Sequence, residues 1–125
     1  MDKIEIVNTL WETFSKADYR STESILHCDL KVVWPTSREF YDSREMFIAV
    51  NEAFGDGWRF DVQVIEETLS DRVISVVFVS SPDCNDSFFA TSIFDFENGV
   101  IINIETYWAF KDKQPEWRKA LSTVY

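Results

Sequence analysis

The segment SFFATSIFDFENGVIINIETYWAF, residues 87–110, decides the fold of this protein. Its central pair, Asn98-Gly99, lies between two apolar stretches that are typical of β-strands. This pair is the strongest short signal for a hairpin, because a type I′ turn needs positive φ at both central residues. The segment therefore predicts two antiparallel strands, over 87–97 and 100–110.

The turn also predicts which residues face one another. If Glu97 pairs with Val100, side chains at every second position along the two strands share one face of the sheet. The further pairs expected in this register are Ile93 with Ile104, Thr91 with Thr106 and Phe89 with Trp108. These side chains would form an aromatic wall, joined by Trp58, Phe60, Val62 and Val64 from an earlier strand.

Helical patterns come before most of the strand patterns. Ile4, Val7, Leu10, Trp11 and Phe14 recur at spacings of three and four, which predicts one apolar face of a helix with Asp2 as its cap. The other expected elements are helices over 22–27, 43–54 (with Asp42 or Ser43 as its cap) and 115–121, and strands over 30–34, 58–64 and 72–81. Helices first and strands later favour an α+β fold with an antiparallel sheet.

Composition limits the classes of function. The chain of 125 residues is 46% hydrophobic and carries a net charge of −10, which predicts one acidic domain over residues 1–125. Such a charge repels phosphate backbones and anionic surfaces, so we expect no nucleic-acid partner and no membrane partner. Cys28 and Cys84 are far apart in the sequence, and the start of the chain does not resemble a signal peptide, so we expect a cytoplasmic protein.

The second face of the predicted sheet is also apolar. In the expected register it holds five apolar residues and a tyrosine: Phe88, Ala90, Phe94, Phe96, Ile101 and Tyr107. A sheet face in contact with water would be polar, and exposed aromatic residues on this scale usually mark an interface. A symmetric homodimer through this outer face is the expected assembly.

Several short motifs in this order resemble the nuclear transport factor 2-like (NTF2-like) superfamily, in its SnoaL-like and ketosteroid-isomerase-like branches. They are Phe14-Ser15-Lys16-Ala17-Asp18, Leu26-His27-Cys28-Asp29, Val33-Trp34-Pro35, Phe96-Glu97-Asn98-Gly99 and Glu105-Thr106-Tyr107-Trp108. The resemblance implies a cone-shaped fold with helices packed on a curved sheet, a deep apolar pocket, and frequently a homodimer. We expect Trp117 to pack the last helix across the mouth of this cone.

The same resemblance argues against isomerase chemistry. Ketosteroid isomerases use a Tyr in the first helix, an Asp before the Pro that closes the first strand, and an Asp in a later strand. The corresponding positions here are Leu10, Trp34, and either Ser92 or Ile93. None of these side chains can take a proton or stabilise an enolate in the family's way.

The candidate ligand-binding residues combine the aromatic wall with the helices expected to cover it. They are Leu10, Phe14, Trp34, Phe60, Phe89, Thr91, Ile104, Thr106 and Trp108. Asp95 and His27 are the candidate acid–base residues, since His27 is the only histidine and Asp95 is expected near the rim of the sheet. The sequence implies no cofactor and no metal, because one histidine and scattered carboxylates do not form a ligand set.

Three hypotheses for function follow. The first is a protein that binds a small, mostly apolar molecule in the cone, because aromatic pockets with few polar groups are typical ligand sites. The second is a cofactor-free isomerase, lyase, cyclase or hydrolase acting on a small hydrophobic substrate. The third is a dimeric protein-interaction module that uses the outer face.

Overall fold

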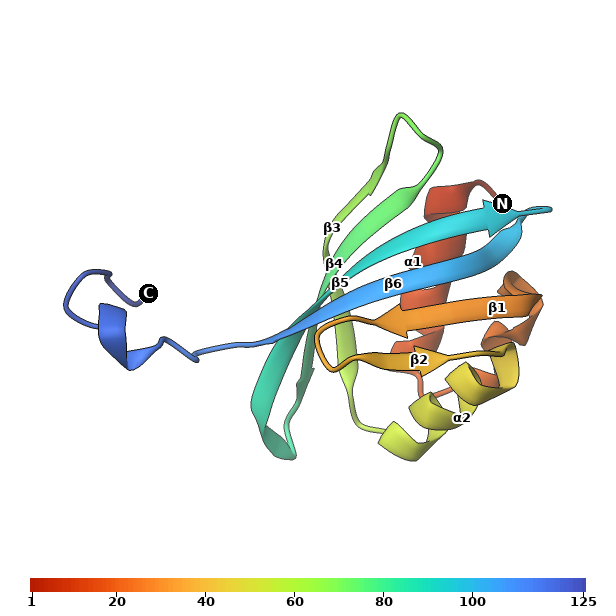
Figure 1. The fold of residues 1–125 in the computed structure, drawn as a ribbon. Coiled ribbons are helices and arrows are strands. Elements are labelled where there is room, and N and C mark those ends of the chain that lie inside the picture. The colour runs from red at the N-terminus through yellow and green to blue at the C-terminus, as the bar shows by residue number, and fades with distance from the viewer.

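The computed structural model describes residues 1–125. Helices α1 (Lys3–Ser15) and α2 (Arg44–Phe54), with the 3-10 segment η1 (Tyr19–Ile25), cover one face of a sheet (Figure 1). Both α-helices start at the predicted caps: the Asp2 side chain accepts the backbone N–H of Glu5, and the Ser43 hydroxyl accepts that of Met46. Neither is long and apolar enough to cross a membrane.

The sheet has six strands in the order β2-β1-β6-β5-β4-β3. The strands are β1 (Leu26–Trp34), β2 (Glu39–Tyr41), β3 (Arg59–Glu67), β4 (Val73–Ser81), β5 (Cys84–Glu97) and β6 (Val100–Phe110). All neighbours are antiparallel except β1 and β6, which are parallel, so the expectation of a purely antiparallel sheet is wrong. Parallel neighbours need a long connection, and here residues 35–99 supply it. The α+β prediction itself is confirmed, and the sheet curves around the helices.

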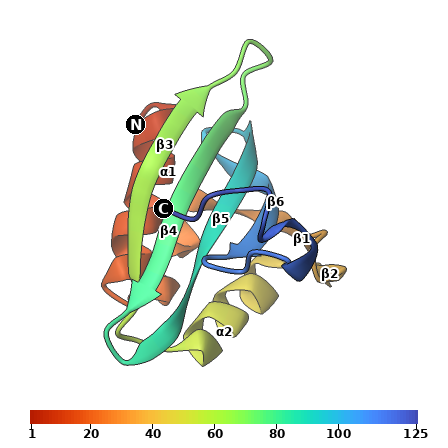
Figure 2. The ribbon, with the colours of Figure 1, turned by 90° about the vertical axis from the view of Figure 1, so that its left-hand side faces the viewer.

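The hydrophobic core fills the space between this sheet and the helices. Helix α1 packs on β3 and β4, as Figure 2 shows from the side of these strands, and α2 packs on β1 and η1. In the core, the Trp11 indole stacks on Phe60 with 5.7 Å between ring centres, and its N–H donates to the Ser75 hydroxyl at 3.1 Å. Trp11 therefore has both apolar contacts and a partner for its polar atom.

A β-bulge in β6 changes the predicted register of the last hairpin. Glu97 pairs with Val100 as predicted, but Ile102 is an extra residue, so Asp95 pairs with Asn103. Beyond it the observed pairs are Phe94 with Ile104, Ser92 with Thr106, Ala90 with Trp108 and Phe88 with Phe110. The predicted partners of Ile104, Thr106 and Trp108 are therefore each wrong by one residue.

Because of this shift, each side chain of β5 lies on the opposite face of the sheet from the one predicted. Side chains of β5 that face the helices are Phe88, Ala90, Ser92, Phe94 and Phe96, and those on the outer face are Phe89, Thr91, Ile93 and Asp95. Phe94 is fully buried and packs on Trp11, at 6.3 Å between ring centres. Because β5 is apolar on both faces, its alternation could not indicate which face meets the helices.

A second bulge lies in β3, where Gln63 is the extra residue. Phe60 and Val62 lie on the inner side as predicted, but Val64 pairs with Val76 and is 46% exposed. The prediction that Val64 belongs to the aromatic wall is therefore wrong.

The remaining differences concern short elements. The predicted second helix is the 3-10 segment η1, which ends before His27, and β1 begins at Leu26 rather than at residue 30. Strand β2 was not predicted, because three residues are too few to show a period of two.

The end of the chain extends away from the sheet (Figure 1). In place of a helix over 115–121 there is one short 3-10 turn, η2 (Glu116–Arg118), and Trp117 is 75% exposed. The expectation that Trp117 closes the cone's mouth is wrong: its ring contacts the Arg118 guanidinium, at 5.6 Å from the ring centre, and packs on no part of the core.

Candidate ligand-binding pocket

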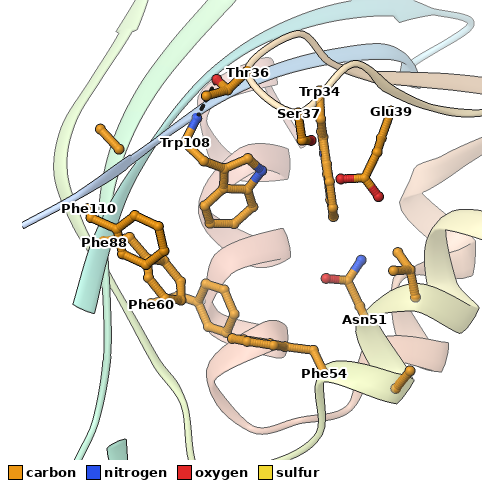
Figure 3. A pocket seen from close by; sticks show the side chains of 13 residues that line it. Trp34, Thr36, Ser37, Glu39, Asn51, Phe54, Phe60, Phe88, Trp108 and Phe110 are labelled. Carbon is orange, nitrogen blue, oxygen red and sulfur yellow. Dashed lines mark hydrogen bonds between the residues drawn. The ribbon is translucent and has the colours of Figure 1, made fainter. Parts of the chain in front are cut away.

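An open pocket of about 600 Å³ lies at the mouth of the cone, where the turn after β1 and helix α2 face the ends of β5 and β6 (Figure 3). From β1, its turn and β2 come Trp34, Thr36, Ser37 and Glu39. Helix α2 contributes Val50, Asn51, Ala53 and Phe54. The long strands contribute Phe60, Phe88, Trp108, Ala109 and Phe110. The volume is that of pockets that hold small organic molecules.

Aromatic rings form a continuous wall along the strand side of this pocket. Trp34 meets Trp108 at 5.5 Å between ring centres, Trp108 meets Phe88 at 5.6 Å, and Phe88 meets Phe110 at 5.8 Å. All three contacts are edge-to-face, the arrangement that the ring quadrupole favours. The rings hold one another in place, so the wall does not depend on a ligand for its shape.

The closed end of the cone, by contrast, is filled by side chains. Only a void of about 20 Å³ remains there, enough for one water molecule. Leu10, Phe14, Ile104 and Thr106 border this void and not the pocket at the mouth. Trp34, Phe60 and Trp108 border both spaces, so they form the floor of the mouth pocket.

Phe89 and Thr91, the other two predicted ligand-binding residues, lie on the outer face of the sheet. Phe89 packs on Phe78, at 5.1 Å between ring centres. Thr91 pairs with Tyr107, whose side chain is exposed. The bulge at Ile102 is the reason, and the sheet separates both residues from a ligand in the pocket. The hydroxyl that meets Thr106 is that of Ser92, at 2.8 Å.

Few polar groups border the pocket, and one of them has no partner. The Trp108 backbone N–H donates to the Thr36 hydroxyl at 3.2 Å, but its indole Nε1 is buried without any hydrogen-bond partner. Figure 3 shows the Trp108 indole in the pocket, with Nε1 on the side of Trp34. A buried donor left unpaired costs about 1–3 kcal/mol, and this N–H is the one buried side-chain polar atom whose hydrogen bond the chain does not supply.

Asn51 and Glu39 supply the other polar atoms that matter. Asn51 Nδ2 donates to the Phe47 carbonyl at 2.8 Å, and Oδ1 accepts no hydrogen bond within the chain. Glu39 accepts the Tyr41 hydroxyl at 3.2 Å. Burial, together with this bond, raises the pKa of Tyr41 to about 12, so the hydroxyl stays a donor at physiological pH.

Neither candidate acid–base residue lies in the pocket. Asp95 lies on the outer face and accepts a charge-assisted hydrogen bond from Arg72 Nε at 2.8 Å. His27 is at the other end of β1 from Trp34: its Nδ1 accepts the Asp29 backbone N–H at 2.9 Å, and its Nε2 lies 3.1 Å from Glu97. Both ring nitrogens of His27 therefore have partners within the chain.

The contacts of the two His27 ring nitrogens also matter for metal binding. Ligand atoms of His27, Cys28 and Asp29 lie within 4.8 Å of one another. However, His27 Nδ1 is already an acceptor for the Asp29 backbone, and Nε2 faces Glu97. His27 is therefore already engaged within the chain, whereas the Cys28 thiol and the Asp29 carboxylate are exposed.

Several pocket residues escaped the sequence analysis. Glu39 belongs to the unpredicted strand β2, and Phe88 and Phe110 were assigned to the wrong face or left out of the site. For Asn51 a signal was present: Phe47, Asn51 and Phe54 are spaced by four and three, which places a polar residue on the apolar face of α2.

No protein-family model matches the chain, and no curated protein is similar to it in sequence. Solved structures do match it over nearly its whole length. A protein of Kribbella flavida, provisionally named a ketosteroid isomerase, is 13% identical with a TM-score of 0.81, covering 98% of this chain and 88% of that chain. An NTF2-like protein of unknown function from Burkholderia xenovorans is 20% identical with a TM-score of 0.77, covering 97% and 93%. The protein has the NTF2-like fold.

A third similar structure is that of a provisionally named SnoaL-like polyketide cyclase from Shewanella putrefaciens. It is 11% identical with a TM-score of 0.68, covering 83% of this chain and 87% of that chain. At such identities the likeness concerns the fold and not the activity.

The sequence leaves Ser92 and Ile93 as alternatives for the third isomerase position. Ser92 faces inwards and is bonded to Thr106, whereas Ile93 faces outwards. Of the two, only Ser92 lies on the inner side of the cone with Leu10 and Trp34. None of them offers a carboxyl or phenol group.

Proposed function

We propose that this protein binds a small, mostly apolar molecule in the pocket at the mouth of the cone. The support is the pocket itself: about 600 Å³, open to solvent, and lined by two tryptophans and four phenylalanines. An exposed apolar hollow of this kind is stabilised when a ligand replaces the water in it. The sequence analysis placed part of the site at the closed end of the cone, which side chains fill. The ligand is proposed to bind at the mouth of the cone instead.

The unpartnered Nε1 of Trp108 is the observation that carries the proposal. It is the only buried side-chain nitrogen or oxygen atom of the chain without a hydrogen-bond partner. A carbonyl, ether or hydroxyl oxygen of a ligand above Trp108 would supply the missing acceptor. The proposed ligand thus combines an apolar body with at least one acceptor.

A pair of probes tests this proposal: methyl naphthyl ketone, which carries an acceptor, and ethylnaphthalene, which does not. We expect both to raise the melting temperature and the ketone to bind more tightly, because only it pairs with Trp108. A ligand at about one hundred times its Kd adds about 2.7 kcal/mol to the free energy of unfolding.

Trp108→Phe keeps an aromatic ring and removes the N–H, so the ketone should lose its advantage and the hydrocarbon should not. Trp117→Phe, in the exposed tail, is the matched control and should leave both probes unchanged. If neither these probes nor a wider panel of hydrophobic metabolites stabilises the protein, it does not bind ligands of this class.

For the enzyme hypothesis, Glu39 replaces Asp95 and His27 as the candidate acid–base residue. Asp95 and His27 lie outside the pocket, and Glu39 is the only ionisable side chain in its lining. An acid–base reaction on a bound molecule would therefore have to use Glu39. Asp95→Ala and His27→Ala should leave ligand binding in the pocket unchanged.

We also propose a homodimer through the outer face of the sheet, although of the six residues that the sequence placed there only Tyr107 lies on it. Phe88, Ala90, Phe94, Phe96 and Ile101 face inwards. The outer face instead carries Phe78, Phe89, Val64 and the exposed Tyr107. Sedimentation at micromolar concentration should give the mass of two chains, and Phe89→Glu should give one; a wild-type monomer would contradict both the dimer and the interaction-module hypothesis.

The cytoplasm is the proposed location. Its support is that Cys28 and Cys84 are both free and exposed, which suits a reducing compartment. Cell fractionation tests it.

A further inference from the structure

Glu39 is the only charged side chain that lines the pocket, and it has no ion-pair partner in the chain. The Tyr41 hydroxyl donates to Glu39 Oε2, and Oε1 accepts no hydrogen bond. The exposed carboxylate is therefore oriented by a neutral donor, and no positive charge of the chain pairs with it. A carboxylate at the edge of an aromatic hollow is a site of negative potential.

The pairing of β1 with β2 explains why this charge stands among aromatic rings. Trp34 pairs directly with Glu39, and Val32 pairs with Tyr41. Residues paired in this way lie on the same face of a sheet, about 4.5–5.5 Å apart at Cβ. The Trp34 and Tyr41 rings meet at 4.6 Å between their centres. Figure 3 shows the Trp34 indole edge-on, with Glu39 on one side of the ring and Trp108 on the other.

No basic side chain forms an ion pair with Glu39, and Arg38, its neighbour in the chain, has no ion-pair partner of its own. Lys31, on β1, lies 2.7 Å from the Asp42 carboxylate. Lys113 contacts the Phe110 ring but lies 3.7 Å from Asp86, and no Lys or Arg borders the pocket. The chain as a whole carries a charge of −10, so its long-range field also attracts cations.

We infer that the ligand of this pocket is an organic cation: an amine or quaternary ammonium group, with its charge between Glu39 and the face of Trp34, on an apolar body that also carries the acceptor for Trp108 Nε1. The inference rests on the proposed function and names the chemical class that the pocket selects. A cation over a tryptophan face is attracted by the ring quadrupole, and tryptophan is the best ring for this contact. The apolar body would extend towards Phe54, Phe88 and Phe110.

Three probes with the same body but different charge test this inference: phenylbutylamine, phenylbutanol and phenylbutyrate. Their heads are cationic, neutral and anionic at pH 7. We expect the amine to bind at least about fivefold more tightly than the alcohol, and the acid more weakly than either. Raising the salt concentration should weaken binding of the amine and hardly affect the alcohol. Calorimetric titration measures all three.

The chain supplies a matched pair of variants for this test. Glu39 and Tyr41 are repeated on the outer face by Glu105 and Tyr107, whose hydroxyl donates to Glu105 at 2.7 Å. Glu39→Gln should abolish the preference for the amine over the alcohol. Glu105→Gln removes the same kind of carboxylate from the other face and should change neither.

The outcomes separate the two proposals. If the alcohol binds and the amine has no advantage, or if Glu39→Gln leaves the advantage intact, the pocket binds ligands but the cation inference is wrong. If none of the three probes binds, and the naphthyl probes also fail, the proposed function is wrong as well. If Glu105→Gln removes the preference for the amine, the cation binds on the outer face and the inference is wrong.

Discussion

Replacing Thr106 by valine tests the register on which the whole pocket depends. The hydroxyl oxygens of Ser92 and Thr106 lie 2.8 Å apart between β5 and β6, and both residues are buried. Thr106→Val keeps the branched shape of the side chain and leaves the Ser92 hydroxyl buried without a partner. We predict a loss of about 1–3 kcal/mol in the free energy of unfolding, the cost of an unsatisfied buried polar group.

A double-mutant cycle isolates the interaction from other effects of each change. Ser92→Ala should also destabilise the protein, but the double variant should cost less than the two single changes together. The difference, about 1 kcal/mol, is the coupling between the two hydroxyls. Urea unfolding followed by the fluorescence of the five tryptophans measures these free energies. With a slope of about 1–3 kcal/mol per molar urea, a loss of 2 kcal/mol moves the midpoint by roughly 1 M.

Thr91→Val is the control, because Thr91 is the partner that a hairpin without a bulge would give to Thr106. On the outer face this change should stay within about 0.5 kcal/mol of the wild type. Coupling of Thr106 with Thr91, and none with Ser92, would refute the bulge at Ile102. Phe88 would then leave the pocket wall and Phe89 would enter it.

Three further predictions concern stability, each read from the same urea curves. Gly99→Ala should cost roughly 1–2 kcal/mol, because Gly99 has a φ of +79° in the hairpin turn, where a Cβ is strained. Trp11→Phe should cost about 1–3 kcal/mol, because it leaves the buried Ser75 hydroxyl without its indole donor, whereas Trp117→Phe in the exposed tail should have no effect. The hydrogen bond from the backbone N–H of Glu5 lowers the pKa of the Asp2 carboxyl in the folded state below its usual value of 3.8. The capping carboxylate therefore stabilises the fold above pH 3.8, and this stabilisation is lost as the pH falls through the pKa of the folded state. Asp2→Asn should remove the contribution of Asp2 to the acid dependence of the free energy of unfolding.

Elements that depend on neighbours in the sequence could be predicted from it. Asp2 and Ser43 cap the two α-helices as expected, since a cap needs only a backbone N–H three residues away. The Asn98-Gly99 turn has positive φ at both residues, as its composition indicates. Only a strand as short as β2, with three residues, gave no local signal.

The candidate site was predictable only where its residues belong to such elements. Trp34 stands before the proline that closes β1, and Phe60 and Trp108 occupy inner positions of long strands, so their direction could be inferred. Glu39 could not be found, because its role follows from pairing with Trp34 across a strand that the sequence does not reveal. Asn51 could have been predicted from the sequence, since its spacing from Phe47 places it on the apolar face of α2.

By itself, then, the chain determined its two α-helices, the turn of its last hairpin and its aromatic character, because these depend on interactions within a few residues. Tertiary structure alone decided which face of β5 meets the helices, where β1 joins the sheet, and that the hollow lies at the mouth of the cone and not at its closed end. Strand β5 is apolar on both faces, so only the packing of Phe94 and Ile104 against the helices selects one of them. One extra residue at Ile102 makes that packing compatible with the turn, and its position depends on contacts far apart in the sequence.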